Sequence, residues 1–123
     1  MSATLRLTAV VALIASAPLL GSPARAASGR VPDCTGSERY PAMVALVKAR
    51  NAGLVKQGEA PRQARVVRIA SEKIGSNLYR QVHDITFTLG GGRRLELITV
   101  GDVSSEECSV SSVRVLQATE LLR

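Results

Sequence analysis

The spacing of apolar residues predicts one helical segment near the start of the chain's second third. Between residues 41 and 57, apolar side chains recur every three or four positions, at Met43, Val44, Leu46, Val47, Leu54 and Val55. This period is typical of an amphipathic helix. Pro41 suits the first helical turn, and Gly58 with Pro61 provides a stop. We therefore expect a helix over 41–57 whose apolar face lies across a small sheet.

After residue 61 the period of the apolar pattern changes from 3.6 to two, which predicts β-strands. In the stretch 65–73, Val67 and Ile69 share one side, and a turn follows at 75–77. The next stretch places its larger apolar side chains on one face, and these are Tyr79, Ile85, Phe87 and Leu89. We expect these two stretches to form neighbouring strands joined by a tight turn.

Two more strands are expected before the chain ends. The alternation continues after residue 92 at Leu95, Leu97, Ile98 and Val100. The last two of these indicate a bulge or a strand covered on both faces. A final strand over 110–121 places Val113 and Val115 on one side. Consecutive strands usually pair with their neighbours, and the helix is the element left to cover their apolar face. The sequence predicts an α+β fold with one amphipathic helix packed on a four-stranded antiparallel sheet.

The first 26 residues have the pattern of a secretory signal peptide. Arg6 precedes an apolar run over 7–20, and the tripeptide ending at Ala26 is an A-x-A cleavage site. The apolar run is shorter than the roughly 20 residues that span a bilayer, and Pro18 interrupts it. We therefore expect no stable membrane anchor. Cleavage would leave a single exported domain of residues 27–123, in the periplasm of a Gram-negative bacterium or outside the cell.

The composition of that domain predicts a thin core. The whole chain has 16 Lys and Arg against 10 Asp and Glu, a net charge of +6. Loss of Arg6 and Arg25 with the leader lowers the net charge to +4. The chain has no Trp and only one Phe, so Val, Leu and Ile must supply most of the core. A small domain of this kind gains much from a covalent link between distant segments.

Cys34 and Cys108 are the only two cysteines, and they predict that link. Oxidation is favoured in exported proteins, and two cysteines allow one internal pairing. The bond would connect the segment before the helix to the segment before the last strand. Cys34 and Cys108 are 74 positions apart, and by the chain-entropy model closing a loop of this length stabilises the fold by about 4 kcal/mol. Together with His83 these cysteines lack the paired spacing of a zinc site, so we expect no metal and no cofactor.

The single histidine does not form a catalytic group with its neighbour. His83 shares a strand face with Ile85, whereas Asp84 points to the opposite face, so the two cannot act as a pair. The chain also lacks a G-x-S-x-G nucleophile motif. We therefore expect no enzyme activity, with His83 at the edge of the core. The alternative is that His83 lines a cavity between helix and sheet.

The three consecutive glycines at 90–92 lie between two alternating strands. Phosphate-binding loops instead join a strand to a helix and have a different glycine spacing. Glycine accepts positive φ without a steric penalty, so these residues predict a hairpin turn. Arg93 and Arg94 follow the turn directly. We expect this tip to contact a partner.

Basic residues also gather in the predicted helix and first strand, at Lys48, Arg50, Lys56, Arg62, Arg65 and Arg68. Export and the absence of aromatic residues among them argue against nucleic acid as a partner. We expect a protein or an anionic component of the envelope to contact Arg93 and Arg94, with support from Lys48 and Lys56. A solvated basic surface without a partner is the alternative that the pattern leaves open.

The order of one helix followed by an antiparallel meander resembles the cystatin-like fold over about residues 40–122. Cystatins inhibit papain-type proteases through a Gln-x-Val-x-Gly hairpin and a Pro-Trp hairpin. Here Gln81 and Val82 lie inside a predicted strand, and the chain has no tryptophan. The resemblance therefore implies an architecture used for binding and inhibition, but it carries over no inhibitory residue.

Together these features predict a small exported, disulfide-stapled binding protein that acts by protein contact, as an inhibitor, immunity factor or envelope accessory. One alternative is a ligand carrier or small enzyme that uses a cavity at His83. Another is a structural component of the envelope. The sequence pattern favours the first function and leaves both alternatives open.

Overall fold

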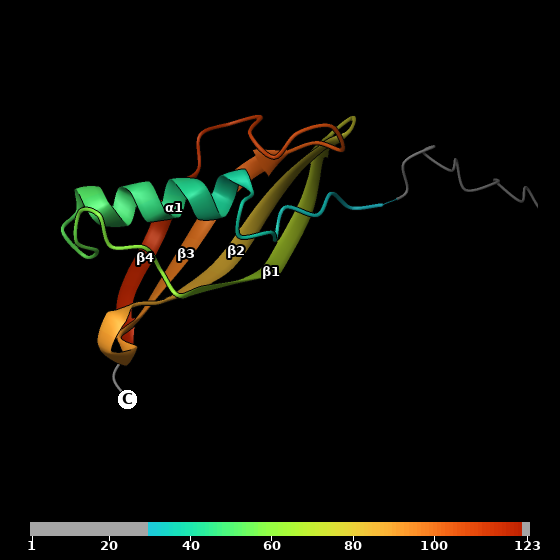
Figure 1. Cartoon of the computed structure of the whole chain (residues 1–123). Helices are drawn as coiled ribbons and strands as arrows, with labels where there is room; N and C mark the ends of the chain where they lie inside the picture. The colour runs from blue at the N-terminus through green and yellow to red at the C-terminus, as the bar shows by residue number, and fades with distance from the viewer. Residues whose placement is uncertain (1–29, 122–123) are drawn as a thin grey trace, which may run out of the picture.

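The structure is a computed structural model that describes residues 30–121, so the signal peptide expected at 1–26 lies outside the described residues. Helix α1 (Tyr40–Asn51) is followed by strands β1 (Gln63–Gly75), β2 (Leu78–Thr88), β3 (Arg94–Val103) and β4 (Arg114–Leu121). The four strands form one antiparallel sheet in the order β1-β2-β3-β4. Figure 1 shows α1 lying across one face of this sheet. The predicted α+β fold and its meander are confirmed.

Helix α1 is shorter than the predicted segment 41–57, because the chain leaves the helix at a glycine. Gly53 has a φ of 76°, a left-handed conformation that glycine adopts without steric cost. Its N–H donates to the carbonyl of Arg50 at 3.0 Å, which closes the last turn. Gly53 therefore ends the helix, and the stop expected at Gly58 comes after the helix has already finished.

Helix α1 directs its alanines, rather than its larger apolar residues, toward the sheet. Ala42, Ala45 and Ala49 are buried, whereas Met43 is 56% exposed and Val47 is 52% exposed. The expectation that these larger residues form the buried face is therefore wrong. An alanine has no side chain beyond Cβ, so the helix backbone can lie close to the strands that it covers.

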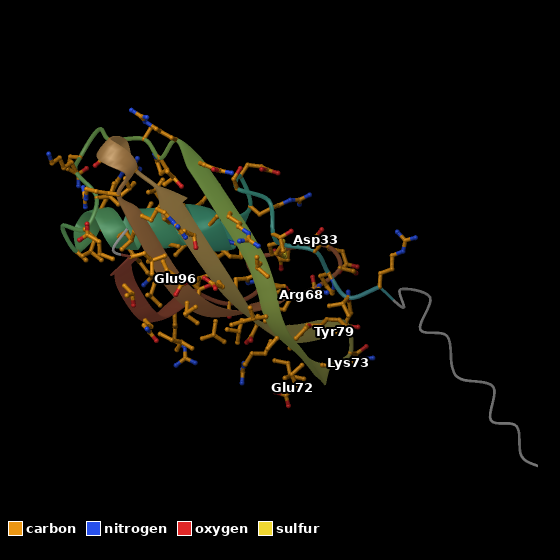
Figure 2. The ribbon with its side chains drawn as sticks, turned by 90° about the horizontal axis from the view of Figure 1, so that it is seen from below. Asp33, Arg68, Glu72, Lys73, Tyr79 and Glu96 are labelled. Atoms are coloured by element: carbon orange, nitrogen blue, oxygen red, sulfur yellow. A yellow bond between two sulfur atoms is a disulfide. The ribbon has the colours of Figure 1, made fainter. Side chains whose placement is uncertain are left out.

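The face of the sheet that α1 covers, which we call the inner face, carries most of the core. Its buried apolar residues on β2 and β3 include Ile85, Phe87, Leu95 and Leu97, and Leu89 follows directly after β2. Ile85 pairs with Leu97, and Phe87 pairs with Leu95, so the predicted alternation is confirmed here. The opposite, outer face faces the viewer in Figure 2, with α1 behind the sheet.

In β1 both residues that were predicted to share a side, Val67 and Ile69, are exposed, and the strand contains a bulge at Ile69. Val67 pairs with Asp84 on the outer face and is 39% exposed. Ile69 lies in the shift of register between β1 and β2, and it is 55% exposed. Val66, paired with Ile85, packs against the core instead. A bulge adds one residue to one strand, so it changes which residues share a face.

The predicted disulfide is present between Cys34 and Cys108, whose Cα atoms lie 5.8 Å apart. Cys34 is fully buried and precedes α1, and Cys108 belongs to the connection between β3 and β4. The bond therefore joins the chain that enters the helix to the chain that leads into the last strand. This position matches the one expected from the sequence.

Candidate functional site

Arg93, one of the expected contact residues, is bound within the molecule. Its Nε donates to the carboxylate of Glu120 on β4 at 3.0 Å. One terminal nitrogen of its guanidinium donates to the carbonyl of Leu54, after α1, at 3.2 Å. Arg93 thus holds the tip of the β2–β3 hairpin between β4 and the chain that follows the helix. Its contact with a partner stays a prediction.

Glu59 fastens the same hairpin tip from the other side. Its carboxylate accepts the backbone N–H of Gly90 at 3.2 Å and that of Lys56 at 3.3 Å. The Gly90 N–H, followed by the Lys56 N–H, lowers the pKa of the Glu59 carboxyl. The hairpin tip and the segment after α1 therefore form one unit, with Lys56 at its exposed edge.

The four expected contact residues do not form one patch. Arg93 and Lys56 belong to the hairpin unit just described, and both act on the pKa of Glu59 through their charge. Lys48 lies on α1 beside a groove lined also by Val115 and Ala118 of β4. Arg94 lines a hollow of the outer face with Arg65. The sequence could not show this separation because it depends on the strand register.

His83 lies on the inner face and is only 1% exposed. It pairs with Thr99 of β3 and with Arg68 of β1. Burial lowers the pKa of His83 most strongly; the charge of Arg68 lowers it further, and the charge of Asp33 opposes this. Figure 2 shows Asp33 on the N-terminal segment near Arg68. The lowered pKa favours a neutral His83 side chain. Asp84 points to the other face of the sheet, so its carboxylate cannot pair with His83.

The N-terminal segment covers the polar part of the inner face around His83. The carbonyl of Pro32 accepts a hydrogen bond from Arg68 and another from Gln81, both at 2.9 Å. Three buried polar atoms here have no hydrogen-bond partner among the described residues: Gln81 Oε1, His83 Nε2 and Thr99 Oγ1. His83 does not line any of the grooves described below, and a ligand cavity at that ring stays a prediction.

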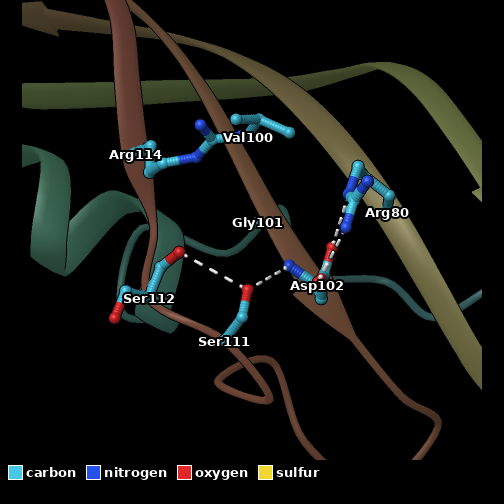
Figure 3. Close-up of a pocket in the computed structure, with 7 residues that line it drawn as sticks. All are labelled: Arg80, Val100, Gly101, Asp102, Ser111, Ser112 and Arg114. Atoms are coloured by element: carbon cyan, nitrogen blue, oxygen red, sulfur yellow. Dashed lines mark hydrogen bonds and ion pairs between the residues drawn. The ribbon is translucent and has the colours of Figure 1, made fainter.

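A polar hollow of about 410 Å³ opens at the edge between β3 and β4 (Figure 3), lined by Arg80, Val100, Gly101, Asp102, Ser111, Ser112 and Arg114. Arg80 donates twice to the Asp102 carboxylate, at 2.9 and 3.3 Å. Ser111 Oγ accepts the Asp102 N–H at 2.9 Å and donates to the Ser112 carbonyl at 3.4 Å. Because most polar groups of this hollow bind each other, it offers little to a ligand.

A second groove, of about 450 Å³, lies between α1 and the start of β1. We call it the α1–β1 groove, and it is lined by Ser37, Ala42, Met43, Leu46, Pro61, Arg62, Gln63, Ala64 and Phe87. It exists because α1 packs over β2 and β3 and leaves the edge strand β1 beside it (Figure 1). Six of these nine lining residues are apolar, and Ser37, Arg62 and Gln63 are polar.

The exposed side of α1 continues this groove as an apolar surface. We call it the helix strip, and it is lined by Tyr40, Met43, Val44, Leu46, Val47 and Arg50. Met43 and Leu46 belong to both the strip and the groove. Sequence reasoning missed this surface, because the apolar residues of the helix were expected inside. The alanines at 42, 45 and 49 were the signal that could have revealed it.

The outer face carries a basic hollow directly behind the start of β1. We call it the arginine hollow; its volume is about 300 Å³, and it is lined by Gln63, Arg65, Thr86, Thr88 and Arg94. Gln63 lines this hollow and also the α1–β1 groove. The start of β1 therefore has a mostly apolar groove on its inner side, and on its outer side its own Arg65 shares a hollow with Arg94 of β3.

The chain matches no family model, no curated protein and no solved structure. Within residues 30–121, no three His, Cys, Asp or Glu side chains gather in a way that could hold a metal ion. In the same residues, no helix has both the length and the apolar character to cross a membrane. The site is therefore interpreted from its geometry alone.

Proposed function

We propose that this chain is a small exported binding protein, stapled by its disulfide, that acts by contact with another protein. The helix strip is the observation that supports this function. A helix that packs through alanine and exposes Met43 and Val47 leaves its larger apolar side chains in water. Contiguous apolar surface of this kind typically marks a site of interaction.

The energetics favour a protein partner for the helix strip. Each Å² of apolar surface removed from water contributes about 25 cal/mol, so covering the strip stabilises a complex more than covering a charged surface would. The partner would also pack against Met43, whose flexible side chain adapts to differently shaped surfaces. Arg50 and the rim of the α1–β1 groove supply the polar border that such interfaces have.

The biological role that fits this surface is that of an inhibitor, immunity factor or envelope accessory. Location in the periplasm or outside the cell follows from the leader expected at 1–26 and agrees with the disulfide. The cystatin-like order of elements agrees with a function in binding. The net positive charge favours an acidic partner.

Differential affinity capture tests this function. The purified, oxidised chain would be immobilised beside the variants Met43→Asp and Val47→Asp, and exposed to an envelope extract. The control is Leu116→Asp, which introduces the same charge at an exposed apolar residue of β4 (58% exposed). We expect a protein that the wild type and the control retain and that both strip variants lose. An identical set of retained proteins for all four chains would refute the proposed role of the helix strip.

A further inference from the structure

We propose that an extended segment of the partner protein, with alternating apolar and acidic residues, adds as a fifth strand to the edge of β1 over Gln63–Val67. This inference rests on the proposed function and specifies how the partner binds. It is drawn from three features of the same edge: unpaired backbone, an apolar groove on one side, and a basic hollow on the other.

The first feature is the position of β1 in the sheet. β1 pairs only with β2 among the described strands, because the strand order places it at an edge. An edge strand presents a row of backbone N–H and C=O groups that another strand can pair with. The N-terminal segment crosses the inner face at Arg68, where Pro32 accepts its hydrogen bond. We place the added strand along the first half of β1, because only that half lies between the α1–β1 groove and the arginine hollow.

The second feature is that the two faces of this half differ in chemistry. Side chains of an added strand would point alternately to the inner and the outer side of the sheet. On the inner side they meet the α1–β1 groove, with Met43, Leu46 and Phe87 as its apolar lining. On the outer side they lie next to Arg65, at the β1 end of the arginine hollow. An apolar residue suits the first position and a carboxylate suits the second.

The third feature is the charge along the edge, which excludes a second copy as the favoured occupant. Four basic residues and one acidic residue occur from 62 to 75: Arg62, Arg65, Arg68, Lys73 and Glu72. Two copies of this strand placed side by side would bring like charges together, which is destabilising. An acidic strand instead gains attraction from Arg65 beside it and, at longer range, from Arg94 on β3, and neither arginine has a salt bridge among the described residues.

A synthetic peptide tests the inference directly. The probe is an eight-residue peptide of alternating valine and aspartate, acetylated and amidated at its ends. We expect it to shift the backbone amide NMR signals of residues 63–67 and to slow their hydrogen exchange. A peptide of alternating valine and lysine should not bind, because it places cations in the arginine hollow. Equal binding of the two peptides would overturn the inference.

Matched arginine variants test the geometry. The double variant Arg65→Gln with Arg94→Gln should weaken binding of the valine–aspartate peptide about tenfold, since the charge pair with Arg65 and the longer-range attraction of Arg94 are both lost. The control, Arg114→Gln, removes an exposed arginine of the polar hollow near β4, at the opposite edge of the sheet. We expect less than about a twofold change for the control. Equal losses for both would indicate unspecific attraction and overturn the inference.

Binding of the captured partner to the variants shows whether the inference or the proposed function is wrong. If the strip variants lose the partner but the double arginine variant keeps it, the binding function stands and strand addition at β1 is refuted. If no partner depends on Met43 but the valine–aspartate peptide still binds at 63–67, the edge site stands and the proposed function of the strip fails. Dimerisation of the chain through β1, seen in analytical ultracentrifugation, would also overturn the inference.

Discussion

The part of the inner face that α1 does not fill carries three polar residues, which are Thr99, His83 and Gln81. Each is buried, and each has one side-chain atom without a hydrogen-bond partner among the described residues. Burying an unpaired polar atom costs free energy relative to an apolar group of the same shape. At these positions an apolar substitution should therefore raise the free energy of unfolding, although most substitutions of buried residues lower it.

We expect Thr99→Val to stabilise the fold by about 1 kcal/mol, because it replaces an unpaired hydroxyl with a methyl group of similar size. The free energy of unfolding in urea measures this. The control is Thr86→Val on the outer face, where Thr86 is only half-buried. That change should stay within about 0.5 kcal/mol. A loss of stability for Thr99→Val would show that its hydroxyl forms a hydrogen bond in solution.

His83 should make the stability of the fold depend on pH. Its pKa is lowered by burial from an ordinary value of 6.5, so the unfolded chain binds a proton more readily than the folded chain. Stability is therefore present above the unfolded pKa and is lost as the pH falls through 6.5 toward the folded value. Glu96 acts oppositely, because burial and the nearby Asp84 raise its pKa above 4.5. Glu96 lies on the outer face (Figure 2), where it pairs with Thr86, whereas His83 lies on the inner face and pairs with Thr99.

The variant His83→Gln should lose part of the acid-side decrease in stability. Urea unfolding at about pH 7.5 and about pH 5 would measure the difference for the wild type and the variant. Glu96→Gln serves as the control, and it should make the acid-side decrease steeper, because the gain that Glu96 provides at low pH is removed. A decrease of equal size in His83→Gln and the wild type would show that His83 does not contribute.

At the scale of elements, the hairpin between β2 and β3 is held in place by Arg93 but not by the neighbouring Arg94. Arg93 bonds to Glu120 and to the Leu54 carbonyl, whereas Arg94 lies in the arginine hollow. We expect Arg93→Ala to reduce stability by about 1 kcal/mol, since the hydrogen bond to a backbone carbonyl and a half-exposed ion pair are both lost.

The matched variant Arg94→Ala should stay within about 0.5 kcal/mol of the wild type, because it removes an exposed side chain without such bonds. Thermal unfolding of both variants, followed by circular dichroism, measures the comparison. If Arg94→Ala were the more destabilising change, the structural role that we assign to Arg93 would be wrong.

The contact between α1 and the sheet depends on small side chains. Ala45 is fully buried and packs in the core cluster with Ile85 and Leu97. Ala45→Leu should reduce stability by about 1–3 kcal/mol, because overpacking forces helix and sheet apart. Met43→Leu on the exposed side of the same helix should leave stability nearly unchanged. Urea unfolding of the two variants tests whether α1 is oriented as described.

The sequence pattern predicted the elements better than their faces. In β2 the alternation of apolar residues identified the buried face correctly, because every second residue from Gln81 to Leu89 is buried. In α1, the spacing of apolar residues could not show which side of the helix is buried, since alanine and valine both count as apolar. In β1, the bulge at Ile69 breaks the alternation, and its position depends on pairing with β2. The helix strip was missed for the first of these reasons, because the larger apolar residues of α1 were expected inside.

At the scale of the whole molecule, the disulfide connects the two parts of the chain that the sheet does not hold together. Cys34 and Cys108 are 74 positions apart, so the bond closes most of the described chain into a loop. Replacing both by serine should reduce the free energy of unfolding by about 4 kcal/mol, through greater entropy of the unfolded chain.

Urea unfolding of the oxidised wild type and of the double serine variant measures this prediction. The oxidised wild type treated with a reducing agent provides the comparison without mutation, and it should lose a similar amount. A change of less than about 1 kcal/mol in both cases would contradict this account, because loss of the bond should raise the entropy of the unfolded chain whatever holds the folded domain together.

The same closed loop has a consequence for survival among secreted proteases. Every hairpin tip between residues 34 and 108, including the glycine turn at 90–92, lies inside the covalent ring. A single cleavage at one of these tips would therefore open the ring without releasing a fragment. A nicked molecule would migrate as one species on a non-reducing gel and separate into two pieces only after reduction.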